Sequence, residues 1–532
     1  MLNNKKIYII GGGVSGLAAA CFLKNKGFNV CIIEKNNTLG GRLFEYEENG
    51  FRFNNGPSWY WMKDVFDEVY EEIGISKKDV YKLNKLDPQY KMVFDDEEFV
   101  IPGEYKKTQE MFSDLSKSNK LESFINKSHK KYDIARKIFL RYNNLSFTEY
   151  LNLETIKNII HFDFNISYRE YCKKFSDNKH LQKILEWPSL FIGSSPKKIS
   201  AMYSMLTYSM IHDGTFLPED GLVDIVKVLT KRANELDVEI KLNESVKDYI
   251  IKNKKIIGIK TNNSVYKNVE SIIAGCDYQF NESILPRKFR TYPKSYWEKI
   301  ELCPSCLLFH IGINKKLETD DFHVLFFDNN LDSHMNEIYN LKTVPENPLF
   351  YLNITSKKLK TAPDGHENLF ILIPTGPHMI ITNETVTKYY DYVINKIEKY
   401  YDTKIKENIV CKKIFKDSDF KSRFNAYGGN AYGLSCHPLQ SAFLKPRIKS
   451  RYLNNLYYCG QLTNPGPGVP PSLLSGIVTS KYFIKNRNKS NKFNFGESLT
   501  LVIAIFARTL SLYTTIKIIL KEIIYIFSGY IL

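Results

Sequence analysis

The sequence predicts an α/β protein in which a Rossmann-like dinucleotide-binding domain is interleaved with a second, α+β domain. A strand, a glycine-rich turn, a helix and a second strand that ends in an acid follow one another within residues 6–34. The chain has 532 residues, too many for one simple core, so we expect two or three domains. Near the C-terminus, the proline- and glycine-rich run 465–470 indicates either a surface loop or a backbone shaped for close approach to a ligand.

The N-terminal unit begins with a short β-branched strand at residues 6–10 and continues into an alanine-rich helix. In the turn between them, Gly11 permits the tight bend, Gly13 lets the backbone approach a pyrophosphate, and Gly16 lets the helix pack on the strand. The helix N-terminus offers N–H groups and a positive dipole end to phosphates. Glu34, at the end of the second strand, can accept hydrogen bonds from both ribose hydroxyls. This arrangement predicts a dinucleotide site.

A second glycine pair, Gly40 and Gly41, precedes Arg42 shortly after the acid. Arginine can bind a phosphate through two parallel hydrogen bonds, and a plain NAD dehydrogenase does not need this group. The pattern resembles the extended pyrophosphate motif of FAD-binding, amine-oxidase-like flavoproteins. We therefore expect FAD, and the alternative is an ordinary surface turn.

Residues 53–66, FNNGPSWYWMKDVF, resemble a segment of the carotenoid desaturases, specifically of the bacterial-type phytoene desaturases. Lys63 replaces the proline that this family usually has. Further segments resemble the same family in order along the chain: 190–196, 214–222, 272–277, 429–434, 440–443 and 460–476. Asp220 stands where the family usually has a glycine, which puts a close approach of that turn to the flavin in doubt.

The resemblance implies an FAD site that is assembled from remote segments. Beyond the N-terminal motif, it assigns cofactor binding to Gly56, Pro57, Ser58, Val246, Gly460, Gln461, Gly468, Val469 and Pro470. Val246 matches the position at which such flavoproteins hold adenine through backbone groups. Gly460 and Gln461 would lie near the flavin or its ribityl phosphate. A helix that starts at Ser472 would direct its positive end at the isoalloxazine and favour the reduced, anionic ring.

The family architecture implies a discontinuous FAD domain and an interleaved substrate domain. The FAD domain would consist of residues 1–95, 217–300 and 425–490, and the substrate- and membrane-facing domain of residues 96–216 and 301–424. The middle FAD piece has support of its own, because a helical run precedes strand-like runs with Asn253 near a hairpin turn. Aromatic residues make up 14% of the chain, and they either fill cores or line an apolar tunnel.

The resemblance implies an FAD-dependent phytoene desaturase, an oxidoreductase of CH–CH groups that works toward lycopene, with the flavin reoxidised by oxygen or a quinone. Hydride transfer to flavin N5 requires the protein to position the substrate C–H bond and to exclude water, rather than to supply acid–base chemistry. We therefore name no catalytic acid or base. We expect His212, His323 and His437 to be structural. The alternatives are a C30 dehydrosqualene desaturase, a carotenoid ketolase, a carotene isomerase, a more distant amine or porphyrinogen oxidase, and a non-enzymatic prenyl-binding escort protein of the same fold.

The formal net charge is +16, with lysines spread along the whole chain. This spread favours a compositional bias over a nucleic-acid partner, and it is compatible with an anionic membrane surface. The nine cysteines are dispersed, as in a cytosolic protein with reduced thiols, and the lone Cys303–Cys306 pair is weak evidence for a metal, so we predict none. Met1 to Lys6 is polar, and we expect no signal peptide.

Residues 491–532 form a hydrophobic tail in which charged residues interrupt every run before it reaches the roughly 18 residues of a clean membrane span. Three interpretations are open: an interfacial helical anchor, a helical pair with one marginal span, and a helix packed on the protein's own core. Because a polyene substrate would dissolve in the bilayer, we favour membrane contact. We therefore expect a peripheral or tail-anchored protein on the cytoplasmic side of a membrane.

Overall fold

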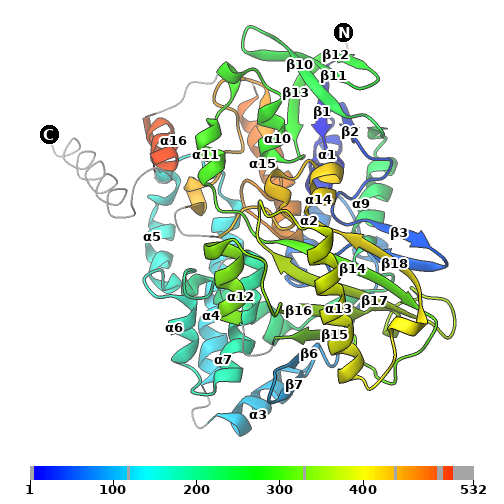
Figure 1. Cartoon of the computed structure of the whole chain (residues 1–532). Helices are drawn as coiled ribbons and strands as arrows, with labels where there is room; N and C mark the ends of the chain where they lie inside the picture. Colours follow the sequence, from blue (N-terminus) through cyan, green and yellow to red (C-terminus); the bar gives the residue numbers. More distant parts are fainter. Residues whose placement is uncertain are drawn as a thin grey trace.

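The computed structural model describes residues 5–116, 120–193, 195–327, 331–436, 440–487 and 495–506. Two main sheets organise this part of the chain (Figure 1). A five-stranded sheet lies in the upper half of the view, and a seven-stranded sheet lies in the lower half, with a group of helices beside it.

The five-stranded sheet is parallel and has the strand order β19-β13-β1-β2-β9. Its strands are β1 (Lys6–Ile10), β2 (Val30–Ile33), β9 (Glu239–Lys241), β13 (Val269–Ala274) and β19 (Leu456–Tyr458). Because side chains alternate along a strand, Ile7 and Ile9 face a layer of helices, whereas Tyr8 and Ile10 face the opposite side. The helical layer contains α1 (Val14–Asn25), α9 (Val223–Glu235) and α15 (Val469–Asn486). The predicted strand–turn–helix–strand unit is therefore present.

The opposite face of the parallel sheet is covered by a small antiparallel sheet and two helices. These elements are β10 (Val246–Lys252), β11 (Lys255–Thr261), β12 (Val265–Lys267), α10 (Tyr278–Ser283) and α11 (Lys294–Lys299). Asn253 and Lys254 form the β10–β11 turn with φ values of 49° and 58°, the left-handed region that short hairpin turns use. The predicted turn near Asn253 is confirmed.

The seven-stranded sheet has the order β18-β14-β17-β16-β15-β6-β7, and its neighbours are antiparallel except for β15 and β6. Its strands are β6 (Tyr90–Val93), β7 (Glu98–Ile101), β14 (Ser305–Ile313), β15 (His323–Phe326), β16 (Phe350–Ile354), β17 (Glu367–Thr375) and β18 (Ile409–Phe415). Central strand β14 is buried at every residue. Leu307 and Phe309 pack in the same cluster as α13 (Asn383–Tyr400), whereas Cys306 and Leu308 belong to the core on the other face.

Helices dominate the expected segment 96–216. They are α3 (Tyr105–Leu115), α4 (Leu121–Lys137), α5 (Leu153–Ile159), α6 (Tyr168–Lys173), α7 (Lys179–Glu186) and α8 (Ser204–Tyr208). The remaining helices described outside this segment are α2 (Lys63–Glu72), α12 (Leu331–Asn336), α14 (Asp417–Phe424) and α16 (Phe495–Phe506). Two short antiparallel pairs are formed by β3 (Glu45–Glu48) with β4 (Phe51–Asn54), and by β5 (Leu83–Lys85) with β8 (Phe216–Pro218).

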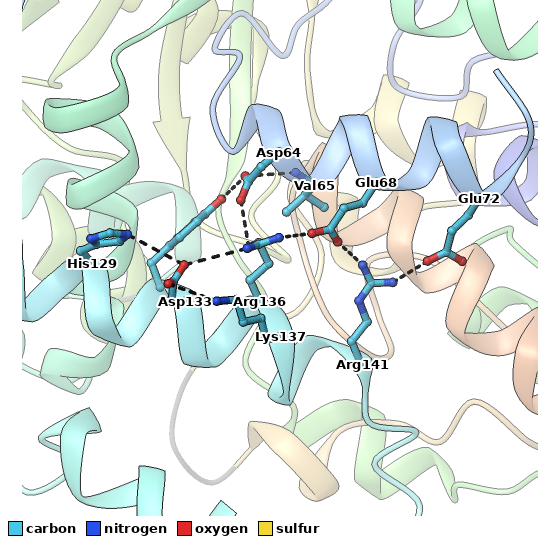
Figure 2. A network of polar contacts seen from close by, with 10 residues as sticks. Asp64, Val65, Glu68, Glu72, His129, Asp133, Arg136, Lys137 and Arg141 are labelled. Atoms are coloured by element: carbon cyan, nitrogen blue, oxygen red, sulfur yellow. Dashed lines mark hydrogen bonds and ion pairs between the residues drawn. The ribbon is translucent and has the colours of Figure 1, made fainter. Parts of the chain in front are cut away.

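A ladder of ion pairs fastens α2 to the end of α4 (Figure 2). Arg136 contacts Asp64 at 2.9 Å and also Glu68, while Arg141 contacts Glu68 and, at 2.9 Å, Glu72. Lys481 of α15 reaches the same Glu72 at 2.6 Å. The ladder therefore ties the helical segment to two helices that border the parallel sheet.

The strands of the parallel sheet all come from the three segments expected for an FAD domain. However, β6 at residues 90–93 pairs with β15 and belongs to the seven-stranded sheet. The expected boundary at residue 95 falls inside the β6–β7 hairpin of that sheet.

The described part of the tail packs on the protein itself. In α16, Leu501 and Ile503 are buried, and the Thr500 hydroxyl accepts a 3.0 Å hydrogen bond from the Phe147 N–H. For residues 495–506, this matches the interpretation of a helix on the protein's own core. Residues 507–532, which include the charged interruptions at 508, 517, 521 and 522, lie outside the described residues. In the described ranges, no helix combines the length and apolar character that crossing a bilayer requires.

Candidate active site

One cavity brings together fifteen of the sixteen predicted site residues. Its lining includes Gly11, Gly13, Glu34, Gly40, Gly41, Arg42, Gly56, Pro57, Ser58, Val246, Gly460, Gln461, Gly468, Val469 and Pro470. The cavity begins at the carboxyl ends of the parallel strands and extends to the aromatic face of the seven-stranded sheet. Gly16 is the exception, because it lies behind the lining: a Cβ atom there would stand 2.0 Å from the Gly11 carbonyl oxygen. This is the helix-packing position that the motif predicts.

The turn after β1 leaves bare backbone at the cavity. Gly11 adopts φ +99°, which L side chains rarely reach, and its N–H donates to the Ile33 carbonyl at 2.8 Å. A Cβ atom on Gly13 would meet no atom closer than the Gly41 Cα at 3.9 Å. Gly13 also caps α1, and a glycine has no side chain that could bond the first-turn N–H groups. Open space and N–H groups therefore coincide at the start of this helix, as an anion site requires.

Glu34 is buried and organises the nucleotide end of the cavity. One carboxylate oxygen accepts a 2.7 Å hydrogen bond from the Gly12 N–H, and the other accepts from the Asn36 N–H at 2.8 Å. Its backbone N–H donates to the Lys241 carbonyl, and its carbonyl accepts from the Glu244 N–H. Each carboxylate oxygen has more than one acceptor position, so capacity for ribose hydroxyls remains. Val246 follows two residues after Glu244 and also lines the cavity.

The second glycine pair lies directly against the first turn. Gly40 forms a parallel bridge with Gly13, and its N–H donates to the Gly12 carbonyl at 2.8 Å. The Arg42 side chain donates to the Asn430 carbonyl at 3.1 Å, while its Nε is buried with no hydrogen-bond partner among the described residues. Burial lowers the pKa of Arg42 to about 10, so the guanidinium is still charged at neutral pH. A partly buried cation whose buried Nε is an unused donor beside bare backbone is suited to a phosphate.

The segment from Gly460 to the start of α15 forms another wall at the nucleotide-binding end of the cavity. The Gly460 N–H donates to the Ser475 hydroxyl at 2.9 Å, and that hydroxyl donates to the Asn464 carbonyl at 2.5 Å. Helix α15 begins at Val469, with Gly468 as its cap, and not at Ser472 as the sequence pattern suggested. Prolines fit a first helical turn because the N–H groups there have no partner within the helix. The expected start was therefore three residues too late, although the helix does point its N-terminus at the cavity.

Aromatic side chains form the far wall of the cavity. The lining there includes Trp59, Trp61, Trp187, Tyr351 and Phe370. The Trp61 indole N–H donates to the Thr215 hydroxyl at 2.8 Å, and the Trp187 N–H donates to the Tyr90 hydroxyl at 3.0 Å. These polar groups are satisfied inside the wall, which leaves mainly apolar ring surface for a ligand.

The predicted structural histidines differ in location. His323 is buried behind the wall: it stacks on Trp59 with ring centroids 4.2 Å apart, and its Nδ1 lies 2.6 Å from the Tyr351 hydroxyl. Burial lowers the pKa of His323 to about 3, so the ring is neutral. His212 lies at the surface beside Asp213, and His437 is outside the described residues.

Asp220 and Cys303 lie away from the lining, whereas Cys306 is part of it. The Asp220 carboxylate forms an ion pair with Lys227 at 2.8 Å and does not line the cavity. Cys303 is buried and its thiol donates to the Leu434 carbonyl, and Cys306 is also buried. Within the described ranges, no group of three or more His, Cys, Asp or Glu side chains could hold a metal ion.

Comparison with known proteins identifies the family. The model of the flavin-containing amine oxidoreductases matches residues 14–482. The chain belongs to this family. Among curated relatives, it is 30% identical to the carotenoid 3,4-desaturase of Haloarcula japonica, over 91% of this chain and 99% of that protein. It is also 30% identical to the 4,4'-diapophytoene desaturase (4,4'-diaponeurosporene-forming) of Staphylococcus aureus, over 90% and 99% of the two chains. Within the family, the chain is therefore a carotenoid-desaturase-type flavoprotein.

Two solved structures show the same fold at low identity. A putative protoporphyrinogen oxidase from Exiguobacterium is 15% identical with a TM-score of 0.57, and the match covers 91% of this chain and 99% of that one. A variant of putrescine oxidase is 14% identical with the same TM-score and the same coverage. The predicted fold class, an amine-oxidase-like flavoprotein fold, is confirmed.

The site of this flavoprotein fits FAD on three observations: bare backbone at Gly13, a helix N-terminus capped by glycine, and the buried Nε of Arg42, which has no partner among the described residues. Gly13, Gly41 and Arg42 would hold the pyrophosphate, and Glu34 the ribose. The sequence did not identify the residues of the aromatic wall, because Trp187, Tyr351 and Phe370 look like ordinary core residues there.

Proposed function

We propose that the chain is an FAD-dependent desaturase of an acyclic polyene isoprenoid, with the conversion of phytoene toward lycopene as the first candidate reaction. The observation that supports this most is the continuity of the cavity from Glu34 and Arg42 to the wall of Trp59, Trp61 and Trp187. A long apolar ligand against that wall would have its carbon atoms next to the bound ring. Bound FAD supplies the hydride acceptor for the removal of two hydrogens from adjacent carbons.

The residues of the chain would contribute positioning and exclusion of water. The satisfied indole N–H groups and the neutral imidazole of His323 present no charge to the cavity, so an apolar chain can lie there without a desolvation penalty. Tyr351, whose hydroxyl is held by His323, fixes one side of the wall. We assign no catalytic acid or base, because the allylic position of the substrate itself stabilises the developing cation.

A second candidate is the desaturation of the C30 polyene dehydrosqualene. It is favoured by the relative that is named a 4,4'-diapophytoene desaturase. A carotenoid ketolase or isomerase activity and a prenyl-binding escort function are further outcomes that the same experiment separates. We also propose a membrane surface as partner, oxygen or a quinone as electron acceptor, and a location on the cytoplasmic side of a membrane.

The test is to incubate the purified flavoprotein with liposomes that carry either phytoene or dehydrosqualene, and to separate the coloured products by chromatography. Products with additional conjugated double bonds from one of the two polyenes are expected. Enzyme from which the flavin has been stripped is the matched control and should form no product. Flavin-containing protein that consumes neither polyene would contradict the proposal, and protein purified without flavin absorbance would support the escort function instead.

A further inference from the structure

Five of the large apolar side chains exposed on the described part of the chain are concentrated in residues 151–164. They are Leu151 (51% exposed), Leu153 (75%), Ile159 (41%), Ile160 (75%) and Phe164 (50%). The other exposed large hydrophobic residues of the described ranges are scattered between residues 100 and 452. Single exposed apolar residues are normal, but a cluster of this kind marks an interaction surface. We call residues 151–164, which include α5, the α5 face.

An apolar layer connects the α5 face with the cavity. Phe162 is buried beneath the face and packs with Ile138 of the neighbouring helical segment, and Phe164 stacks on it with ring centroids 5.5 Å apart. Met202 and Met205 contact this small cluster and also the large core cluster to which the cavity walls belong. Leu206, the next residue along α8, lines the cavity itself. A continuous series of apolar side chains therefore connects the exposed face with the site.

Helix α16 lies next to the turn that directly precedes the α5 face. The helix contacts this turn, residues 147–150. Phe443, next to α16, has its ring centroid 5.6 Å from that of Tyr150. Figure 1 shows α16 and α5 on the same side of the molecule. Helix α16, whose sequence is mostly apolar, and the α5 face therefore lie on one side.

We propose that the α5 face docks into a lipid bilayer, with Leu153 and Ile160 inserted among the acyl chains. This proposal rests on the proposed function, because a polyene dissolved in the bilayer would then reach the cavity through the adjacent apolar layer. Glu154 and Lys157 are the exposed charged residues of the face, and their charges cancel. The half-exposed Asp163 carboxylate is paired with Lys131 at 2.8 Å. Docking by this face is therefore driven by apolar burial and depends little on lipid charge or on salt.

A fluorescent probe tests where this face lies. All nine natural cysteines are buried or partly buried, so a cysteine introduced at an exposed position can be labelled selectively. Ile160→Cys in the full chain would carry an environment-sensitive dye, and Ile380→Cys is the matched control, because Ile380 is 77% exposed and lies between β17 and α13. Adding neutral phosphatidylcholine vesicles without polyene should shift the emission of the dye at 160 to the blue, and leave the dye at 380 unchanged.

Vesicle flotation supplies the energetic test. Leu153→Glu/Ile160→Glu should lower partitioning onto the same vesicles by about tenfold or more, the value expected for losing the insertion of two large aliphatic side chains, whereas Ile380→Glu should not. Flavin absorbance of each variant reports that it is folded. Equal partitioning of the double variant, or no spectral shift at 160, would overturn the proposal.

A dye at 160 that is already blue-shifted before vesicles are added would also overturn it. That result would assign the face to the protein's own residues 507–532 if it is independent of concentration, and to a second copy if it grows with concentration. Neither assay contains a polyene, so the docking proposal and the desaturase proposal can fail independently.

Discussion

Changing Gly13 or Gly16 to alanine should have opposite effects on flavin binding and on the stability of the fold. Gly13 has φ −71°, which any residue adopts, and an added Cβ would point into open cavity. Gly16 lies between α1 and the turn, where an added Cβ would stand 2.0 Å from the Gly11 carbonyl oxygen and 3.2 Å from a methyl group of Ile9. Gly13→Ala should therefore impair flavin binding without impairing the fold, whereas Gly16→Ala should impair the fold itself.

The size of both effects follows from these contacts. At Gly16 the contact falls about 1.4 Å short of the 3.4 Å at which ordinary van der Waals contact begins, and the opposing atom is backbone. Helix α1 must then move away from β1, so the cost should reach or exceed the roughly 1–3 kcal/mol of typical overpacking. At Gly13 the stability of the flavin-free protein should change little, because the gain of up to about 1 kcal/mol from restricting the unfolded chain is offset by the loss of glycine at the N-cap of α1, where alanine is disfavoured. The new methyl group would occupy the place of the pyrophosphate, so FAD affinity should fall by about tenfold or more, or roughly 1.4 kcal/mol.

The assay measures two quantities on each variant: the flavin retained after extensive dilution, and the thermal midpoint of the flavin-free form. We expect Gly13→Ala to lose flavin with a nearly unchanged midpoint, and Gly16→Ala to show a lower midpoint by several degrees. If Gly13→Ala kept its full flavin content, the pyrophosphate would not pass this residue, and the reasoning about the N-terminal turn would be refuted. An unchanged midpoint for Gly16→Ala would refute the close helix–strand contact.

Glu34→Gln should weaken FAD binding by about 1–3 kcal/mol, because the amide NH₂ group would face one of the backbone N–H groups that now donate to the carboxylate. Unchanged flavin retention would contradict this. Asp163→Asn should lower the free energy of unfolding, measured in urea, by about 2 kcal/mol, because Lys131 is 1% exposed and would lose its counter-charge at 2.8 Å. Adding Lys131→Met should restore most of the loss. Burial lowers the pKa of three histidines from 6.5: His310 to about 3, His323 to about 3 and His334 to about 4. Their neutral rings support the fold above pH 6.5, and this support is lost as the pH falls toward 4, so each should cost about 1.4 kcal/mol at pH 5.5 in urea unfolding. A midpoint that does not change between pH 7.5 and 5.5 would count against this burial.

The nucleotide-binding end of the site was predictable because it would bind its ligand mainly through backbone groups. A position such as Gly11 or Gly41 must lack a side chain, and that requirement is visible in the sequence as a glycine at fixed spacing from Glu34. The same applies to Gly468, which caps α15. The start of α15 was misplaced because prolines are compatible both with a loop and with a first helical turn, and only the fold decides between them.

The substrate end was not predictable, for an equally physical reason. Trp187 comes from a helical turn, Tyr351 from β16 and Phe370 from β17, and each is flanked by other buried apolar residues. Nothing local distinguishes an aromatic ring that faces a cavity from one that fills a core. Their convergence depends on the register of the seven-stranded sheet, which pairs residues far apart in the sequence.

The order of strands in the parallel sheet has a consequence for how the protein is synthesised. Strand β1 leaves the ribosome first, but its neighbour β13 follows after residue 268 and β19 only after residue 455. At about 5–20 residues per second, the first strands wait for tens of seconds with an unpaired edge. Helix α15, which packs over α1, is translated later still. A ribosome that stops before residue 456 therefore releases a chain without the last wall of its flavin site, and that chain exposes an apolar strand edge prone to aggregation.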